Sequence, residues 1–417
     1  MVQYKRRHST EWRCFVIIRG IDMKNHSKFL IPGIIVVGMI LRLPFTAMPP
    51  ILSSISKSEG VPVGQLGMLT TIPLIAFALF SSTAPKVAQK IGLERAFALM
   101  LMLLIVGSGI RVINTTFLYI GTMLIGIGVA HMNVLLPSVI RTYFPMKVGP
   151  MTSVFTFSMM LATAVGASLA APITALTSWQ VFVGLLTILL VGALLVWLPN
   201  ERFAANRQVT QMASDHKKTV RFNVWKNRNA WLLLFFGGMQ SAMFYVLMAW
   251  GPTMAIQTGL TPATAGLFSG LNSLIGLPFA LTVPSIVVRL NKRQRQWLVA
   301  GFSVLGTIGY LLLLNPQGTF TYWLLVYLFI GVGTSVLFPY LMTTFTLKTS
   351  TPGQTAQLSG MSQSGGYLIA AVGPAMFGYA YGWWHSWTPQ IIVIVILFIL
   401  MTLAIVVVEN REKIIDA

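Results

Sequence analysis

Acidic residues and cysteine are the scarcest reactive side chains in this sequence. Only 9 of its 417 residues are Asp or Glu, against 29 Lys and Arg, and the one cysteine is Cys14. A lone cysteine excludes an intrachain disulfide and a thiolate metal cluster, and it leaves the redox compartment open. Charged residues make up 9% of the chain, hydrophobic residues 55%, and the mean hydropathy is +0.75. These proportions exclude a soluble globular protein.

Long apolar runs separate the few charged segments. Each run has about 20 residues, the length that one α-helix needs to cross the hydrocarbon core. The sequence therefore predicts an all-α polytopic membrane protein with twelve transmembrane helices. The expected spans are Phe29–Leu52, Gly64–Thr83, Ala96–Val112, Phe117–Ile140, Met151–Ala171, Trp179–Leu198, Ala230–Gly251, Ala263–Val288, Trp297–Leu314, Tyr322–Thr344, Ala356–Tyr379 and Pro389–Val408.

Positive charge is distributed very unevenly between the two sides of these spans. Twelve spans place both termini on one side, and every Lys and Arg except Lys57, Arg111 and Arg42 falls on that side. Lys57 and Arg111 fall on the opposite side, and Arg42 lies inside the first span. The positive-inside rule then predicts cytoplasmic termini in a cell inner or plasma membrane. Anionic lipid headgroups account for the basic charge, so we expect a lipid bilayer and no nucleic acid as partner.

The polar segments define the expected domains. Residues 1–22 have no apolar core followed by a small-residue cleavage site, so they do not form a signal peptide, and both Met1 and Met23 are candidate starts. The predicted parts are a cytoplasmic tail (1–28), a six-helix bundle (29–198), a cytoplasmic linker (199–229), a second six-helix bundle (230–408) and a cytoplasmic tail (409–417).

The two halves carry similar glycine and proline signals in the same order. Gly126-Ile127-Gly128 followed by Pro137 in the fourth span matches Gly331-Val332-Gly333 followed by Pro339 in the tenth. Ala164-Val165-Gly166 and Ala371-Val372-Gly373 match in the fifth and eleventh. Because six is even, corresponding spans run in the same direction, which predicts a parallel repeat. The alternative is that membrane helices are simply rich in Gly and Pro.

Two parallel six-helix halves joined by a polar loop resemble the major facilitator superfamily, over residues from about 29 to 408. The loop between the second and third spans is similar to the superfamily motif G-x-x-x-D-R-x-G-R-K. Lys90 and Gly92 match its Arg and second Gly, whereas Pro85 and Gln89 replace the first Gly and the Asp. With Arg95, they form the expected gating loop. A positive anchor with a tight turn explains the same residues equally well.

Ionisable residues are almost absent from the spans. The acids all lie outside them: Glu11, Asp22, Glu59, Glu94, Glu201, Asp215, Glu409, Glu412 and Asp416. Cation export usually needs an intramembrane carboxylate, so its absence argues against that function. We expect no metal and no cofactor. The remaining candidates are Arg42 and His131.

Arg42 has two interpretations. A basic side chain near the bilayer centre costs ~2.5–3.5 kcal/mol on insertion scales, so it is normally functional. Its planar fork of donors suits an anionic or electronegative planar substrate. Alternatively, it hydrogen-bonds carbonyls freed near Pro44, Pro49 and Pro50.

His131 is the one intramembrane group that titrates in the physiological range, so it is the proton-coupling candidate, or else a neutral packing residue. Asn133 is about 200° around the same helix, so the two cannot both face one cavity. The other midspan polar and aromatic residues are Gln240, Tyr245, Trp250, Asn272, Gln363 and Tyr367. Each of these either lines a pocket or joins two helices.

Four segments carry a closer resemblance. They are Leu41-Arg42-Leu43-Pro44, Leu135-Leu136-Pro137, Gln240-Ser241 with Tyr245 and Trp250-Gly251-Pro252, and the string from Ser359 to Tyr367 with Gly373-Pro374. They resemble the cyanate and 2-nitroimidazole transporter family (CynX/NimT). The resemblance implies a small anionic or electronegative planar substrate, with cavity residues Arg42, Gln240, Tyr245, Trp250, Gln363 and Tyr367.

The sequence therefore predicts a monomeric secondary active transporter with alternating access, in which Arg42 anchors a cyanate-like anion or a nitroimidazole-like compound. His131 is a further substrate-site candidate. The alternatives are a proton-coupled efflux pump for neutral drugs or metabolites, an intramembrane enzyme and a receptor. An enzyme is disfavoured because the midspan regions hold one His and no acid to form a catalytic pair.

Overall fold

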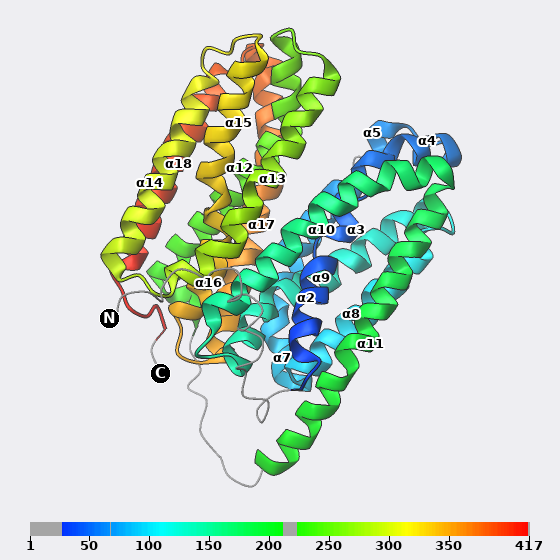
Figure 1. Ribbon diagram of the computed structural model, residues 1–417, viewed down its shortest axis with the longest axis vertical. Helices are drawn as coiled ribbons and strands as arrows, with labels where there is room; N and C mark the ends of the chain where they lie inside the picture. The colour runs from blue at the N-terminus through cyan, green and yellow to red at the C-terminus, as the bar shows by residue number, and fades with distance from the viewer. Residues whose placement is uncertain (1–26, 67, 212–222, 416–417) are drawn as a thin grey trace, which may run out of the picture.

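The structure is a computed structural model that describes residues 27–66, 68–211 and 223–415 (Figure 1). Cys14, Met1 and Met23 lie outside these ranges, as does the middle of the expected linker. Within them the chain is helical, apart from turns and one isolated bridge between Thr349 and Ile415. No cis peptide bond occurs in the described residues.

The helices follow the order of the expected spans. The first half contains α2 (Leu30–Ile40), α3 (Leu43–Thr46) and η1 (Pro49–Ile51), α4 (Leu52–Glu59), α5 (Val63–Leu66), α6 (Met68–Phe80), η2 (Ser81–Thr83) and α7 (Ala84–Ile91), α8 (Leu93–Ile110), α9 (Thr115–Tyr143), α10 (Val148–Leu176) and α11 (Trp179–Gln211). The second half contains η3 (Val224–Lys226), α12 (Arg228–Gln257), α13 (Pro262–Val287), α14 (Lys292–Leu312), α15 (Phe320–Ser335), α16 (Leu337–Leu347), α17 (Pro352–Trp384) and α18 (Thr388–Glu409).

Ten helical segments of the described residues are long and apolar enough to cross a membrane. Two more helices, α14 and α17, are long but more polar, because α14 opens on a Lys-Arg-Gln-Arg run and α17 is rich in Gly, Ser and Gln. Several spans combine more than one helix: α2, α3 and η1 form the first, and α15 with α16 the tenth. The order of helices therefore agrees with twelve spans.

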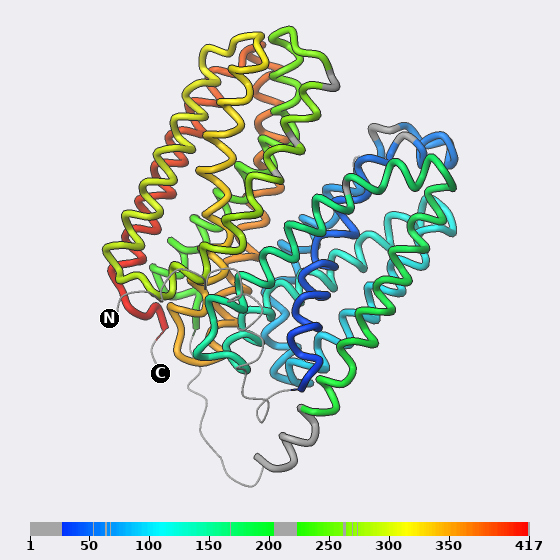
Figure 2. Tube along the Cα trace, viewed as in Figure 1, coloured from blue at the N-terminus to red at the C-terminus, as the bar shows by residue number. Residues whose placement is uncertain are grey.

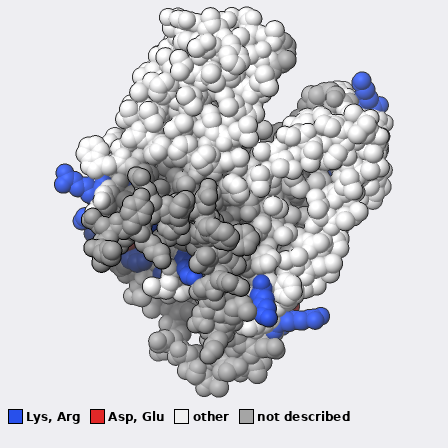
Figure 3. Space-filling view, in the orientation of Figure 1, with Lys and Arg blue, Asp and Glu red and all other residues white. Residues whose placement is uncertain are grey.

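The two halves form separate bundles that converge at one end and diverge at the other (Figures 1 and 2). We call the convergent end the basic end. It contains the start of α2, the end of α18 and the basic loops, whereas α4, which carries Lys57, lies at the opposite, open end. Figure 3 shows a deep notch in the molecular surface between the bundles at the open end.

Hydrogen bonds between described residues of the two halves lie at the basic end or near the middle of the spans. Along α10 and α13, Ser153 Oγ is 2.9 Å from Ser285 Oγ, and Thr156 Oγ1 donates to the Ala280 carbonyl over 2.7 Å. Further along α10, Val165 and Leu169 are 45% and 48% exposed. The structure is therefore closed at the basic end and open at the other.

One helix extends into the segment expected to be a linker. The polar composition places the linker start at Pro199, but α11 continues through Pro199 to Gln211. Polarity marks where a chain leaves the hydrocarbon, and a helix whose backbone bonds are internal can continue into water. The linker therefore begins in a helix.

Close helix packing explains one glycine pair and gives a stability prediction. A Cβ atom on Gly107 of α8 would lie 2.8 Å from the Gly121 carbonyl oxygen of α9. We expect Gly107→Ala to lower the free energy of unfolding by about 1–3 kcal/mol, because the two backbones must separate. Denaturant titration in mixed micelles measures this change.

Gly109, two residues further along α8, is the matched control. A Cβ atom there meets nothing within 4 Å, so Gly109→Ala should leave the unfolding free energy near the wild-type value. Equal destabilisation by both substitutions would contradict the close approach of α8 and α9.

Candidate functional site

A break in the first span determines where Arg42 lies. Helix α2 ends at Ile40, α3 begins at Leu43, and Arg42 is the N-cap residue between them. Pro44 follows within the first turn of α3, where its missing N–H leaves no donor unsatisfied. The Arg42 carbonyl accepts from the Phe45 and Thr46 amides, each at 3.0 Å. The break therefore keeps its own backbone satisfied at membrane depth.

The Arg42 side chain reaches the second half of the molecule. Its Nη1 lies 3.5 Å from the hydroxyl of Tyr245 in α12, and its Cζ lies 5.7 Å from the ring centroid of Phe338 in α16. A guanidinium over an aromatic face is attracted to the negative face of the ring. Among the described residues, no Asp or Glu forms an ion pair with Arg42. The partners of the Arg42 guanidinium are therefore the Phe338 ring and, at a long distance, the Tyr245 hydroxyl.

A second polar group joins α9 of the first half to α17 of the second half. Asn133 Nδ2 donates to Gln363 Oε1 over 2.8 Å and to the Tyr367 hydroxyl over 3.2 Å. Gln363 Nε2 donates in turn to Ser359 Oγ over 2.8 Å. Asn133, Gln363 and Tyr367 are all buried. The predicted site residues Gln363 and Tyr367 thus lie together, and they share a partner that sequence reasoning did not include.

Asn133 carried a signal that was available in the sequence. It is an amide in the middle of an apolar span. The structure shows that its side chain is buried and that its Oδ1 has no hydrogen-bond partner among the described residues. Buried amides usually have all their hydrogen bonds satisfied, so this free acceptor is unusual. We therefore add Asn133 to the candidate site.

A small cavity lies next to this group. Its lining residues are Gly237, Gln240, Ser241, Phe338, Leu341, Met342, Ser362, Gln363, Gly366 and Tyr367, and its volume is about 10 Å³. That volume holds about one water molecule. Gln240 Nε2 donates to the Gly237 carbonyl over 3.1 Å and to Ser241 Oγ over 2.6 Å. Gln240 therefore lines the same cavity as Gln363 and Tyr367, and Phe338 connects that cavity to Arg42.

Trp250 lies apart from this cluster. Its Nε1 donates to the Pro374 carbonyl over 2.9 Å, and its ring lies 5.4 Å from that of Trp387. Both contacts belong to the second half. The structure therefore gives Trp250 a place between α12, α17 and the start of α18, toward the open end.

His131 also lies apart from Arg42. Its Nδ1 is 2.8 Å from the Ile127 carbonyl, and its Nε2 is 3.0 Å from Thr83 Oγ1. A neutral imidazole can donate from Nδ1 and accept from the Thr83 hydroxyl. A protonated imidazolium can donate to both, while Thr83 donates to the Phe80 carbonyl at 2.7 Å. The same three neighbours therefore satisfy either protonation state. As expected from the helix geometry, His131 and Asn133 face different neighbours.

Arg111 corrects the expectation that Arg42 is the one arginine enclosed by the spans. It was assigned to the surface of the opposite side, but it is 1% exposed. Its Nη1 donates to the Pro44 carbonyl over 3.2 Å, and its Nε donates to Thr122 Oγ1 over 3.1 Å. The structural alternative that the sequence offered for Arg42 was a hydrogen bond to a carbonyl near Pro44. Arg111 makes that bond, and so braces the segment that carries Arg42.

The acids were expected outside the spans, and two of them, at helix ends, are nevertheless buried. Glu94, in the first turn of α8, is buried and accepts from the Tyr143 hydroxyl over 2.5 Å. Glu409, the last residue of α18, is 1% exposed and lies 2.8 Å from Lys348 Nζ. Both glutamates lie at the basic end. There the end of a neighbouring helix supplies a hydroxyl to Glu94 and a cation to Glu409.

The expected gating loop lies at the basic end. Lys90 is exposed, and Gly92 has a φ of 90°, where a side chain would be strained. Arg95 pairs with Glu201 of its own half at 3.3 Å. The contact with the other half occurs at Pro85, since a Cβ on Gly360 of α17 would lie 3.2 Å from its ring. No group of three His, Cys, Asp or Glu side chains gathers in the described residues.

Comparisons with known proteins agree with this architecture. Residues 31–374 match the family profile described as Major Facilitator Superfamily. The chain is 35% identical to the uncharacterized transporter YycB of Bacillus subtilis, covering 91% of this chain and 93% of that protein. It is 33% identical to a 2-nitroimidazole transporter of Escherichia coli, covering 90% and 93%. It is 22% identical to the cyanate transport protein CynX of the same species, covering 83% and 88%.

Solved structures show the same fold. The proton:xylose symporter XylE superposes with a TM-score of 0.72 at 12% identity, covering 90% of this chain and 94% of that one. The relatives and the matched folds are transporters, so the protein is a secondary transporter and not an enzyme. The chain belongs to the major facilitator superfamily, and within it resembles the cyanate and 2-nitroimidazole transporters.

Proposed function

We propose that this transporter moves a small planar solute that is anionic or electronegative, and that Arg42 is its anchor. The observation that carries the proposal is the contact of Arg42 with Tyr245 and Phe338 of the other half, with no described carboxylate paired to it. A cation at membrane depth without a counter-charge is costly, and an anionic solute would supply the charge. The names of two relatives, for 2-nitroimidazole and cyanate, support this solute class.

The neighbours of Arg42 suit a planar solute. The guanidinium offers two parallel donors to carboxylate-like or nitro oxygens. The Phe338 ring offers an apolar face, the hydroxyls of Tyr245 and Tyr367 offer further donors, and Gln363 lines the cavity beside Tyr367. A flat molecule held between a ring and a fork of donors is bound by shape as well as by charge. We place Gln240 and Asn133 at the edge of this site and leave Trp250 outside it.

The shape of the molecule supports alternating access as the mechanism. Figure 3 shows the notch at the open end, and the hydrogen bonds of Asn133 to Gln363 and Tyr367 join the two halves at the site. Rocking of the two halves would break these bonds and reclose the notch. We assign the basic end to the cytoplasm of a monomeric inner- or plasma-membrane protein, from its excess of Lys and Arg.

The membrane potential limits the direction of transport. A potential negative inside opposes anion entry by about 2.3 kcal/mol per charge per 100 mV. A plain anion uniporter would therefore export. Uptake needs a co-transported proton or a solute that is neutral when bound, and His131 can satisfy both protonation states with its present neighbours. A proton-coupled efflux pump for neutral nitroaromatic compounds would use the same residues.

Arg42→Gln tests the anchor. We expect it to abolish stabilisation by the ligand in a thermal-shift screen of small anions and nitroheterocycles, with an apparent affinity reduced about 30-fold or more. Arg42→Lys should retain a part of the affinity, since it keeps the charge and loses the fork.

Arg293→Gln is the control for Arg42→Gln, because it removes an exposed arginine that has no part in the site or in the expected gating loop. It should leave ligand binding at the wild-type value. Undiminished binding and flux in Arg42→Gln would exclude Arg42 as the anchor.

His131→Gln tests proton coupling. Glutamine can keep a donor and an acceptor near Ile127 and Thr83, but it cannot take up a proton between pH 5 and 8. We expect solute flux into proteoliposomes to lose its dependence on pH while ligand binding persists. If the pH profile of the variant matched that of the wild type, His131 would be a packing residue.

Asn133→Ala and Tyr367→Phe form a double-mutant cycle across the two halves. We expect a coupling free energy of about 0.5–1.5 kcal/mol in unfolding measurements, because each substitution removes the same hydrogen bond. Tyr310→Phe is the control partner, since the Tyr310 hydroxyl donates within the second half, to the Met243 carbonyl. Additive effects of Asn133→Ala and Tyr367→Phe would mean that the bond does not form.

A further inference from the structure

The turn between α16 and α17, residues 346–352, is a meeting point of both halves and the C-terminal segment. The last carbonyls of a helix have no partner within the helix, and they form the negative end of its dipole. Here the carbonyls of Thr346, Leu347 and Lys348 end α16, and those of Ser350 and Pro352 precede or begin α17. Each of them is paired, but with two different sets of donors.

The first half supplies one set of donors. Arg141 of α9 donates from Nη1 to the Thr346 carbonyl and from Nη2 to the Ser350 carbonyl, the latter over 2.9 Å. Ser138, one turn earlier on α9, donates to the Pro352 carbonyl over 2.9 Å. These bonds join the halves at the basic end. They connect a cation to neutral carbonyls, with no carboxylate involved.

The C-terminal segment, residues 411–415, supplies the other set. The Ile414 amide donates to the Lys348 carbonyl over 2.8 Å. Lys413 Nζ donates to the Leu347 carbonyl over 2.9 Å and to the Thr349 carbonyl over 2.8 Å. The second half therefore hydrogen-bonds some carbonyls of the turn through the C-terminal segment, and Arg141 and Ser138 of the first half hydrogen-bond the others.

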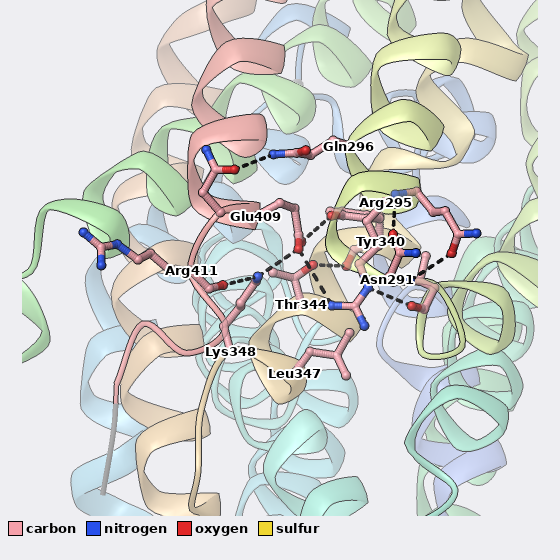
Figure 4. A network of polar contacts seen from close by, with 12 residues as sticks. Asn291, Arg295, Gln296, Tyr340, Thr344, Leu347, Lys348, Glu409 and Arg411 are labelled. Atoms are coloured by element: carbon pink, nitrogen blue, oxygen red, sulfur yellow. Dashed lines mark hydrogen bonds and ion pairs between the residues drawn. The ribbon is translucent and has the colours of Figure 1, made fainter.

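A buried charge cluster fixes the C-terminal segment to the turn. Glu409 lies between Lys348, Tyr340 and Arg295 in Figure 4. Lys348 Nζ is 2.8 Å from Glu409 Oε2 and 2.6 Å from the Arg411 carbonyl, and both charged side chains are at most 2% exposed. Tyr340 donates to Glu409 Oε1, and Arg295 Nη1 lies 3.7 Å from Oε2.

Burial lowers the pKa of the Lys348 ammonium, and the neighbouring Glu409 opposes that change. A buried ion pair is costly to desolvate, and its best-attested use is to specify one geometry. Removing one partner leaves the other buried and unpaired. The cluster therefore favours one arrangement of α18, the C-terminal segment and the turn.

The first half has a matching but weaker pair. Arg95 and Glu201 occupy places in the repeat similar to those of Arg295 and Glu409, at the start of the third and the end of the sixth span. Their side chains are 56% and 30% exposed. An exposed pair contributes little to stability or geometry. The two halves thus differ in burial at equivalent places.

We propose that Glu409 and Lys348 are positioning residues for the transport cycle. They hold the turn 346–352 so that the carbonyls not bound by the C-terminal segment accept hydrogen bonds from Arg141 and Ser138 when the basic end closes. The C-terminal segment is thereby a part of the gate. Arg141 meets carbonyl dipoles rather than a carboxylate, so the gate can open without separating a pair of full charges. The inference rests on the alternating access proposed above, and not on the solute or on Arg42.

The test is a distance between the two halves at the open end. Spin labels are placed on Lys57→Cys and Gln317→Cys, both exposed positions at that end, in a Cys14→Ser background, and their distance distribution is measured in nanodiscs without solute. The wild type should populate mainly the long distance. Arg141→Gln and Glu409→Gln should each raise the short-distance population about five-fold or more.

The combination of substitutions separates positioning from general damage. If Glu409 acts through Arg141, the double variant Arg141→Gln/Glu409→Gln should show no larger shift than Arg141→Gln alone. Glu201→Gln, which breaks the exposed pair, is the matched control and should leave the distribution unchanged. Full additivity in the double variant, or an equal shift from Glu201→Gln, would overturn the proposal.

A milder variant keeps the test available if Glu409→Gln fails to fold. Lys413→Met removes two bonds to the turn and leaves the Lys348 and Glu409 pair intact. It should raise the short-distance population in the same direction as Arg141→Gln. A wild-type distance distribution in Lys413→Met would exclude the C-terminal segment from the gate. Since the measurement uses no solute, it succeeds or fails independently of the Arg42 anchor.

Discussion

The structure depends on satisfying buried and half-buried cations in a chain that has few acids to pair with them. Three arginines show the solutions. Arg42 lies over a phenyl ring and near a hydroxyl, Arg111 donates to a proline carbonyl and a threonine, and Arg141 donates to carbonyls at a helix end. In a low-dielectric interior such oxygen partners are worth more than in water, and an unpaired group is costly. Proline and helix ends, which expose carbonyls, therefore become binding positions for arginine.

These three contacts perform different tasks because they lie at different depths. Arg111, near the open end, braces the break of the first span. Arg42 lies at the middle, between the two halves, where the proposed solute would enter from the notch. Arg141 joins the halves at the basic end. The three cations thus lie at the break of the first span, at the proposed site and at the proposed gate, and among the described residues only Arg42 has no firm partner.

The two halves of the internal repeat differ in burial at one pair of equivalent positions. Both halves place an arginine at the start of their third span near a glutamate at the end of their sixth. In the second half the pair is buried and joined by Lys348 and Tyr340, whereas in the first half it is exposed. A parallel repeat supplies the same backbone positions twice, so equivalent residues can be buried in one half, where we propose the gate, and exposed in the other.

The sequence by itself determined the class of protein, the twelve spans, their parallel repeat and the place of Arg42 inside the first span, because hydropathy, loop charge and a charge at membrane depth are local signals. It also predicted the pairing of Gln363 with Tyr367 from their helical spacing. Only the tertiary structure decided that Asn133 joins them, that Arg111 is buried at Pro44 and that Glu409 has a lysine partner. Those outcomes depend on which faces of distant helices meet, and a one-dimensional pattern of polarity does not contain that information.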